Sequence, residues 1–145
     1  MTLDVSTAQS ITLNGQDVTK ITDGTSVLWE ALPQLPMPSM LNRRNSSDKL
    51  CIQFSVSGVS GVTYYVSYRA STSTPYPSCS SVTTPTKTTY NAKLTGSGSN
   101  SEATLVTNYN ATGNYLMLKV LAVKEGYRSN DPTLCTAHCC ATIYI

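Results

Sequence analysis

The chain has 145 residues, of which only 12% are charged, and its formal net charge is +2. A chain of this length can bury one core of ordinary domain size, which excludes several full domains. The ten basic residues are scattered along the chain, so the electrostatic pattern of a nucleic-acid-binding protein is missing.

Residues 1–31 contain three short stretches of alternating polarity, at 10–13, 17–21 and 25–29, separated by Asn14-Gly15 and Asp23-Gly24. Asn-Gly and Asp-Gly between such stretches are strong hairpin signals, because type I′ turns need positive φ. We therefore predict a small three-stranded β-meander. It is too small to fold securely alone, so its apolar face should dock on a partner surface. The candidate docking residues are Ile11, Leu13, Ile21, Leu28 and Trp29.

Residues 32–47 begin with proline at positions 33, 36 and 38. This spacing forbids a helix and favours extended backbone. We predict a proline-rich linker that leads into a first edge strand.

Residues 48–145 alternate between apolar and polar positions in runs bounded by turn residues. The alternation predicts strands at residues 49–56, 62–69, 90–94, 103–107, 114–124 and 135–145. Residues 70–89 are rich in Ser, Thr and Pro and predict a long loop with at most one edge strand. With the first edge strand, about seven short strands and no helical period indicate an all-β, antiparallel sandwich.

Two further features bear on the compartment. The longest apolar run, residues 116–123, contains Lys119 and falls well short of the roughly 20 residues of a membrane-spanning helix. The first six residues have neither a basic nor an apolar region, so we expect no secretory signal peptide. Five cysteines then meet a reducing cytosol, and their odd number leaves at least one unpaired within a monomer. These are Cys51, Cys79, Cys135, Cys139 and Cys140.

Residues 36–145 resemble a fibronectin type III domain. The resemblance is carried by Pro36-Met37-Pro38 before the first strand and by residues 49–55, 63–69 and 114–124 as later strands. It implies a fibronectin type III or immunoglobulin-like sandwich, with Tyr115 as a corner tyrosine whose hydroxyl bonds to upstream backbone. The family usually has Trp where this chain has Phe54. Residues 124–132 also resemble a turn of bacterial and phage immunoglobulin-like modules.

Residues 11–30, ITLNGQDVTKITDGTSVLWE, resemble a motif of tailed-phage and prophage structural proteins, in which the glycines and the final Leu-Trp-Glu recur together. The resemblance implies a virion component, a capsid decoration or a tail- or fibre-associated protein, assembled in the host cytoplasm in multiple copies. Residues 1–31 would dock on other virion proteins, and residues 48–145 would be displayed toward a host surface glycan or protein. The alternative is a bacterial cell-surface adhesion or carbohydrate-binding module, which would be extracellular.

Cys135, His138, Cys139 and Cys140 are the candidate metal-ligating or nucleophilic cluster. On a strand Cys135 and Cys139 share one face while His138 and Cys140 share the other, so we expect no metal site there. A disulfide between Cys79 and one of the C-terminal cysteines stays open. No nucleophile elbow, paired carboxylate site or phosphate-binding loop is present. We therefore predict a protein that is not an enzyme and needs no cofactor.

Five of the nine tyrosines, at positions 64, 65, 68, 76 and 90, gather around the third sandwich strand and the polar loop. Exposed tyrosine among Ser, Thr and Asn is typical of recognition surfaces, although tyrosine also packs within sandwich strands. The candidate outer binding surface consists of Tyr64, Tyr68, Tyr76 and Tyr90.

Overall fold

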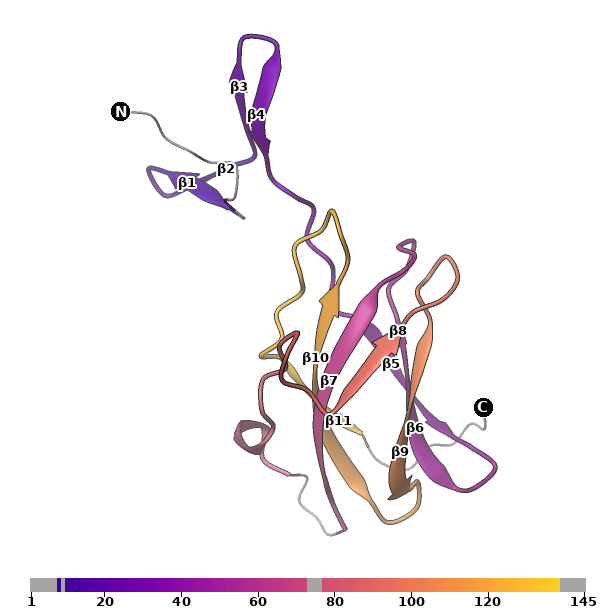
Figure 1. Cartoon of the computed structure of the whole chain (residues 1–145). Helices are drawn as coiled ribbons and strands as arrows, with labels where there is room; N and C mark the ends of the chain where they lie inside the picture. Colours follow the sequence, from indigo (N-terminus) through magenta and orange to yellow (C-terminus); the bar gives the residue numbers. More distant parts are fainter. Residues whose placement is uncertain (1–7, 9, 73–76, 139–145) are drawn as a thin grey trace.

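The computed structural model describes residues 8, 10–72 and 77–138. They form an all-β protein in which two N-terminal hairpins stand off one end of a β-sandwich (Figure 1). The hairpin strands are β1 (Ile11–Leu13), β2 (Gln16–Val18), β3 (Lys20–Asp23) and β4 (Ser26–Glu30). The remaining elements are β5 (Ser39–Arg44), β6 (Lys49–Ser55), β7 (Thr63–Ser71), the 3-10 helix η1 (Cys79–Ser81), β8 (Ala92–Thr95), β9 (Ala103–Asn110), β10 (Tyr115–Val123) and β11 (Cys135–His138).

The N-terminal region corrects the predicted three-stranded meander, because β1 pairs with β2 and β3 pairs with β4 in two separate sheets. The predicted middle strand, residues 17–21, is interrupted at Thr19, which separates β2 from β3. Each half of the predicted middle strand therefore pairs with a different neighbour. The Asn14-Gly15 turn does have the expected positive φ at both positions, 51° and 76°.

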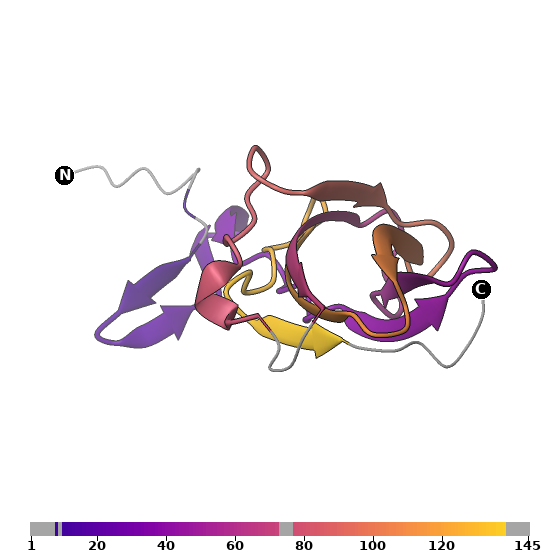
Figure 2. The same cartoon turned by 90° about the horizontal axis from the view of Figure 1, so that it is seen from below.

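The sandwich consists of a three-stranded sheet, β5-β6-β9, and a four-stranded sheet, β11-β10-β7-β8, and neighbouring strands in both sheets are antiparallel. Figure 2 shows these strands curving around a common centre while the hairpins project to one side. The predicted edge strand is confirmed as β5, which pairs only with β6. The predicted strands at 49–56 and 114–124 are confirmed as β6 and β10.

The core is built from the inward positions that the alternation predicts. They are Leu50, Ile52, Phe54 and Val56 around β6 and Leu116, Leu118, Val120 and Ala122 on β10, all at most 1% exposed. Phe54 stacks on Tyr64 of β7 with 5.5 Å between ring centroids. Burial of such side chains at about 25 cal/mol per Å² of apolar surface is the main stabilisation of the sandwich.

The loop after β7 covers the outer face of the four-stranded sheet. No strand occurs within its described part, residues 77–89. A disulfide joins Cys79 to Cys135 of β11, with 6.0 Å between the Cα atoms, so the pairing left open by the sequence is resolved. Val82 is 2% exposed, and its carbonyl accepts a hydrogen bond from the Lys119 amine at 2.9 Å. Cys51 is a buried free thiol, and burial raises its pKa.

The residues predicted as a linker are bound to the sandwich. The Leu35 amide donates to the Arg128 carbonyl at 2.8 Å, and the Arg128 amide donates to the Pro33 carbonyl at 2.9 Å. The Leu35 side chain, 1% exposed, joins the core. The hairpins are therefore attached to the β10–β11 connection as well as to the start of β5.

Asn130 completes the edge of β10 beyond Lys119, which lies opposite Cys135, the first residue of β11. Its side chain is an acceptor for the Ala122 amide at 2.6 Å and a donor to the Val120 carbonyl at 2.9 Å. Asn130 is 4% exposed, so no water replaces these bonds freely. One side chain thus continues the hydrogen bonding that a strand would provide.

Replacing Asn130 with alanine is expected to lower the free energy of unfolding by about 3 kcal/mol, because two buried backbone groups lose their partners. Urea unfolding followed by circular dichroism measures this loss. Asn108→Ala, at an exposed position of β9, is the matched control and should change stability by less than about 0.5 kcal/mol. Equal midpoints for the two variants would contradict the role given to Asn130.

Candidate docking surface

The five predicted docking residues fall into three environments. Leu13, at the tip of the first hairpin, is 66% exposed and Leu28 is 55% exposed. Ile11 and Ile21 are half-buried, opposite Val18 and Trp29 respectively. The structure therefore leaves Leu13 and Leu28 as the predicted residues best able to contact a partner.

Trp29 corrects the prediction, because it is only 7% exposed. Its indole Nε1 donates to the carbonyl of Ala8 at 2.8 Å. Trp29 lines a cavity of about 100 Å³ together with Ile11 and Val18 of the first hairpin, so the two hairpins meet around the indole. Trp29 is thus an internal anchor of the N-terminal region rather than a contact for a partner.

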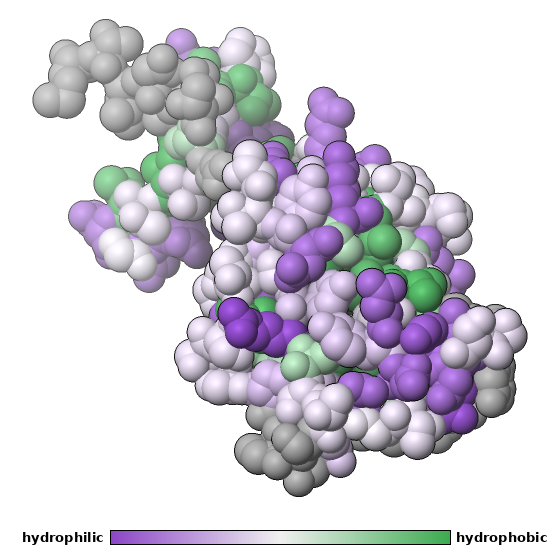
Figure 3. Space-filling view, turned by 60° about the horizontal axis from the view of Figure 1, so that its bottom comes forward, coloured by the Kyte–Doolittle hydropathy of each residue, from purple (hydrophilic) through white to green (hydrophobic). Residues whose placement is uncertain are grey.

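The sequence prediction omitted two exposed apolar side chains, Val27 at 50% and Leu32 at 46%. A bulge explains the exposure of Val27 beside Leu28, since Ile21 lies opposite Trp29 while Thr22 lies opposite Val27, leaving Leu28 as the extra residue. Alternation alone could not place Val27 and Leu28 outward together. Figure 3 shows green, apolar surface over this N-terminal region at the upper left.

The predicted tyrosine surface is corrected at Tyr64. Inward positions alternate along β7, so Tyr64 and Val66 point into the core and both are 0% exposed. The Tyr64 hydroxyl donates to the Ser101 carbonyl at 2.6 Å, and desolvation by burial raises the pKa of Tyr64 to about 12. Tyr64 is a core residue and cannot contact a partner.

The other tyrosines give a smaller surface than predicted. Tyr68 is half-buried against the core, and burial raises its pKa. Tyr90 is 41% exposed and lies 5.1 Å from Tyr65, measured between ring centroids. The amine of Lys93 lies 5.7 Å from the Tyr65 centroid. Tyr65 points outward on β7, and the period of two along this strand could have identified it as a surface residue. Tyr76 lies outside the described residues.

The cysteine–histidine cluster cannot be assembled from the described part of the chain. Cys135 is in the disulfide, His138 ends β11, and Cys139 and Cys140 lie outside the described residues. Across residues 8, 10–72 and 77–138, no three or more His, Cys, Asp or Glu side chains are grouped to hold a metal ion. No helix in these residues is long and apolar enough to cross a membrane.

Tyr115 is the first residue of β10, at the strand start where the fibronectin type III resemblance implies a corner tyrosine. The bond from its hydroxyl to upstream backbone stays a prediction. Comparisons of the whole chain with protein-family models, with curated proteins and with solved structures found no match.

Proposed function

We propose that the protein is a structural component of a tailed-phage virion that docks by its N-terminal hairpins and displays its sandwich. The observation that carries the proposal is the apolar surface of the hairpins: Leu13, Val27 and Leu28 are each at least half exposed. Two-stranded hairpins bury little by themselves and are marginally stable in water. A partner that covers these side chains would stabilise both the complex and the hairpins.

The hairpins also offer backbone for strand addition. Each is a two-stranded sheet, so among the described residues the outer edges of β1 to β4 carry no further strand. Addition of a partner strand would supply main-chain hydrogen bonds, and the exposed leucines would supply side-chain contacts. In a symmetric virion, many copies would allow weak contacts of the displayed sandwich with a host surface to act together.

The sandwich supports the fibronectin type III resemblance within this proposal. Its fourth strand, β8, pairs with the third, β7, whereas a constant-type immunoglobulin domain places its fourth strand beside the fifth. This arrangement favours a fibronectin type III module over a constant-type immunoglobulin domain. Such modules are spacers and display units, and the fold alone assigns no activity.

The alternative is an adhesion or carbohydrate-binding module at a bacterial cell surface. The disulfide between Cys79 and Cys135 favours it, because disulfides persist outside the reducing cytosol. A virion released by lysis reaches the same oxidising environment, so the disulfide is compatible with the main proposal as well. The site of attachment, a particle or a cell envelope, separates the two functions.

Immunogold labelling of cells that encode the chain, before and after lysis, tests the attachment. We expect label on released particles, at the capsid or tail, and its loss by more than about ten-fold in Leu13→Ser/Leu28→Ser. The matched control is Leu41→Ser, which changes an equally exposed leucine of β5 and should keep the label. Label on the envelope of intact cells and none on particles would overturn the virion proposal in favour of the adhesin.

A further inference from the structure

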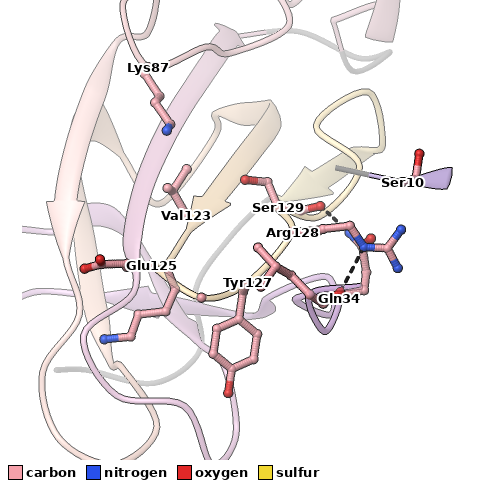
Figure 4. A pocket seen from close by; sticks show the side chains of 11 residues that line it. Ser10, Gln34, Lys87, Val123, Glu125, Tyr127, Arg128 and Ser129 are labelled. Atoms are coloured by element: carbon pink, nitrogen blue, oxygen red, sulfur yellow. Dashed lines mark hydrogen bonds between the residues drawn. The ribbon is translucent and has the colours of Figure 1, made fainter. Parts of the chain in front are cut away.

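A pocket of about 600 Å³ lies where the hairpin region meets the sandwich (Figure 4). This volume is within the range of small-molecule sites in proteins. Three separate segments form it: the chain before β5, the loop that contains Lys87, and the β10–β11 connection. Figure 4 shows Lys87 on one side and Arg128 with Gln34 on the other.

Hydrogen bonds fix the walls of this pocket. The backbone bonds between residues 33–35 and Arg128 hold the first segment against the third. The Arg128 Nε donates to the Leu32 carbonyl at 3.1 Å, and the Gln34 amide donates to the Ser129 carbonyl. These two of the three segments are therefore preorganised, which lowers the entropic cost of binding a ligand.

The pocket has an excess of positive charge. Lys87 and Arg128 are basic lining residues whose positions flank it, and Glu125 is the acidic lining residue. Lys124 lines it as well, but the Lys124 amine lies 3.2 Å from a Cβ placed at Gly61, which is not a lining residue. The two ion pairs of the described residues, Lys20–Glu30 and Arg44–Asp48, lie elsewhere. Two cations, Lys87 and Arg128, against one carboxylate give the pocket a formal charge of +1, so an anionic ligand is favoured.

Charge is combined with apolar and hydrogen-bonding groups. Leu32, Val123 and Tyr127 supply apolar wall, while Ser129 and Gln34 supply polar groups. A sugar presents hydroxyls and an apolar C–H face, and an acidic sugar adds a carboxylate that pairs with lysine or arginine. We propose that this pocket binds an acidic sugar of the hexuronate class within a glycan. A small inorganic anion would leave the apolar wall unused.

Titration of the full-length, ¹⁵N-labelled protein with sodium glucuronate tests the proposal by NMR. We expect saturable shifts at the backbone amides of Gln34, Gly126 and Ser129. Binding should be at least about ten-fold weaker for glucose and should weaken as salt is raised. Lys87→Gln/Arg128→Gln should weaken glucuronate binding by a similar factor.

The matched control is Arg69→Gln/Lys93→Gln, which removes the same charge from exposed positions of β7 and β8. It should bind glucuronate like the unmodified protein. Equal binding of glucose, or of inorganic phosphate or acetate, would overturn recognition of an acidic sugar, as would tighter binding of a tri-aspartate peptide. Loss of binding in the control would overturn the assignment to this pocket.

This inference goes beyond docking and is independent of it. Leu13 and Leu28 do not line the pocket, so Leu13→Ser/Leu28→Ser should bind glucuronate normally even when it no longer attaches to a particle. Failure of sugar binding with intact attachment would overturn the pocket proposal alone.

Discussion

Replacement of Gly96 by alanine is expected to destabilise the sandwich by about 4 kcal/mol, because the new methyl group would overlap backbone that cannot move. A Cβ at Gly96 would lie 2.5 Å from the Ser101 carbonyl oxygen and 2.6 Å from the Ser101 Cβ. Ser101 is 0% exposed and has a φ of 47°, so its backbone conformation is already a restricted one.

Hydrogen bonds to the β6–β7 connection and to β7 hold Ser101 in place. Its hydroxyl accepts from the Val62 amide at 2.9 Å and donates to the Val59 carbonyl at 2.6 Å. Its carbonyl accepts from the Tyr64 hydroxyl, and the Gly96 amide donates to the Val62 carbonyl at 2.8 Å. Moving Ser101 away from a methyl group would break several of these buried bonds together, which explains the size of the expected loss.

Urea unfolding of Gly96→Ala and Gly98→Ala separates overlap from backbone strain. Gly98 has a φ of 70° and open space around it, so alanine there should cost only about 1 kcal/mol. A Gly96→Ala variant no less stable than Gly98→Ala would show that Ser101 yields, and would contradict the rigidity inferred for this end of the sandwich.

The sequence predicts the strands of the sandwich well wherever one face is buried. In β6 and β10 the alternation of Leu, Ile, Phe and Val with other residues follows directly from a period of two. The same rule puts Leu116 and Leu118 on one face, and the structure shows that this face is the core. It failed for Cys51, an outward position by alternation that is 0% exposed. β6 is the central strand of its sheet, so Cys51 has Arg43 of β5 and Val106 of β9 as cross-strand neighbours on the same outer face.

The sequence could not predict which strands pair or which distant segments come together. The bulge at Leu28 and the one-residue link at Thr19 depend on which strands pair, which alternation does not specify. The pocket joins Gln34, Lys87 and Arg128, residues that no local spacing relates. Asn130 resembled an ordinary turn residue, and only the start of β11 at Cys135, opposite Lys119, reveals that Asn130 serves the edge of β10.

Loss of the disulfide between Cys79 and Cys135 is the second large effect that we expect. The bond spans 56 residues of sequence, and the chain-entropy treatment of a loop of this length gives roughly 4 kcal/mol of stabilisation. Cys79→Ser, Cys135→Ser and the double variant should lose similar amounts, because either single change removes the whole bond. Urea unfolding with and without dithiothreitol measures the loss, and the double variant is the control that dithiothreitol should not affect.

Loss of the disulfide should also loosen the loop on the outer face of the four-stranded sheet. Cys79 begins η1, and the chain continues to Val82, whose carbonyl accepts from the buried amine of Lys119. Without the disulfide this loop is held by fewer bonds, so amide hydrogen exchange should rise first in residues 77–89 and in β11. Exchange and urea midpoints that dithiothreitol leaves unchanged would contradict this. The module is therefore expected to be less stable in a reducing cytosol than outside the cell, where the disulfide persists.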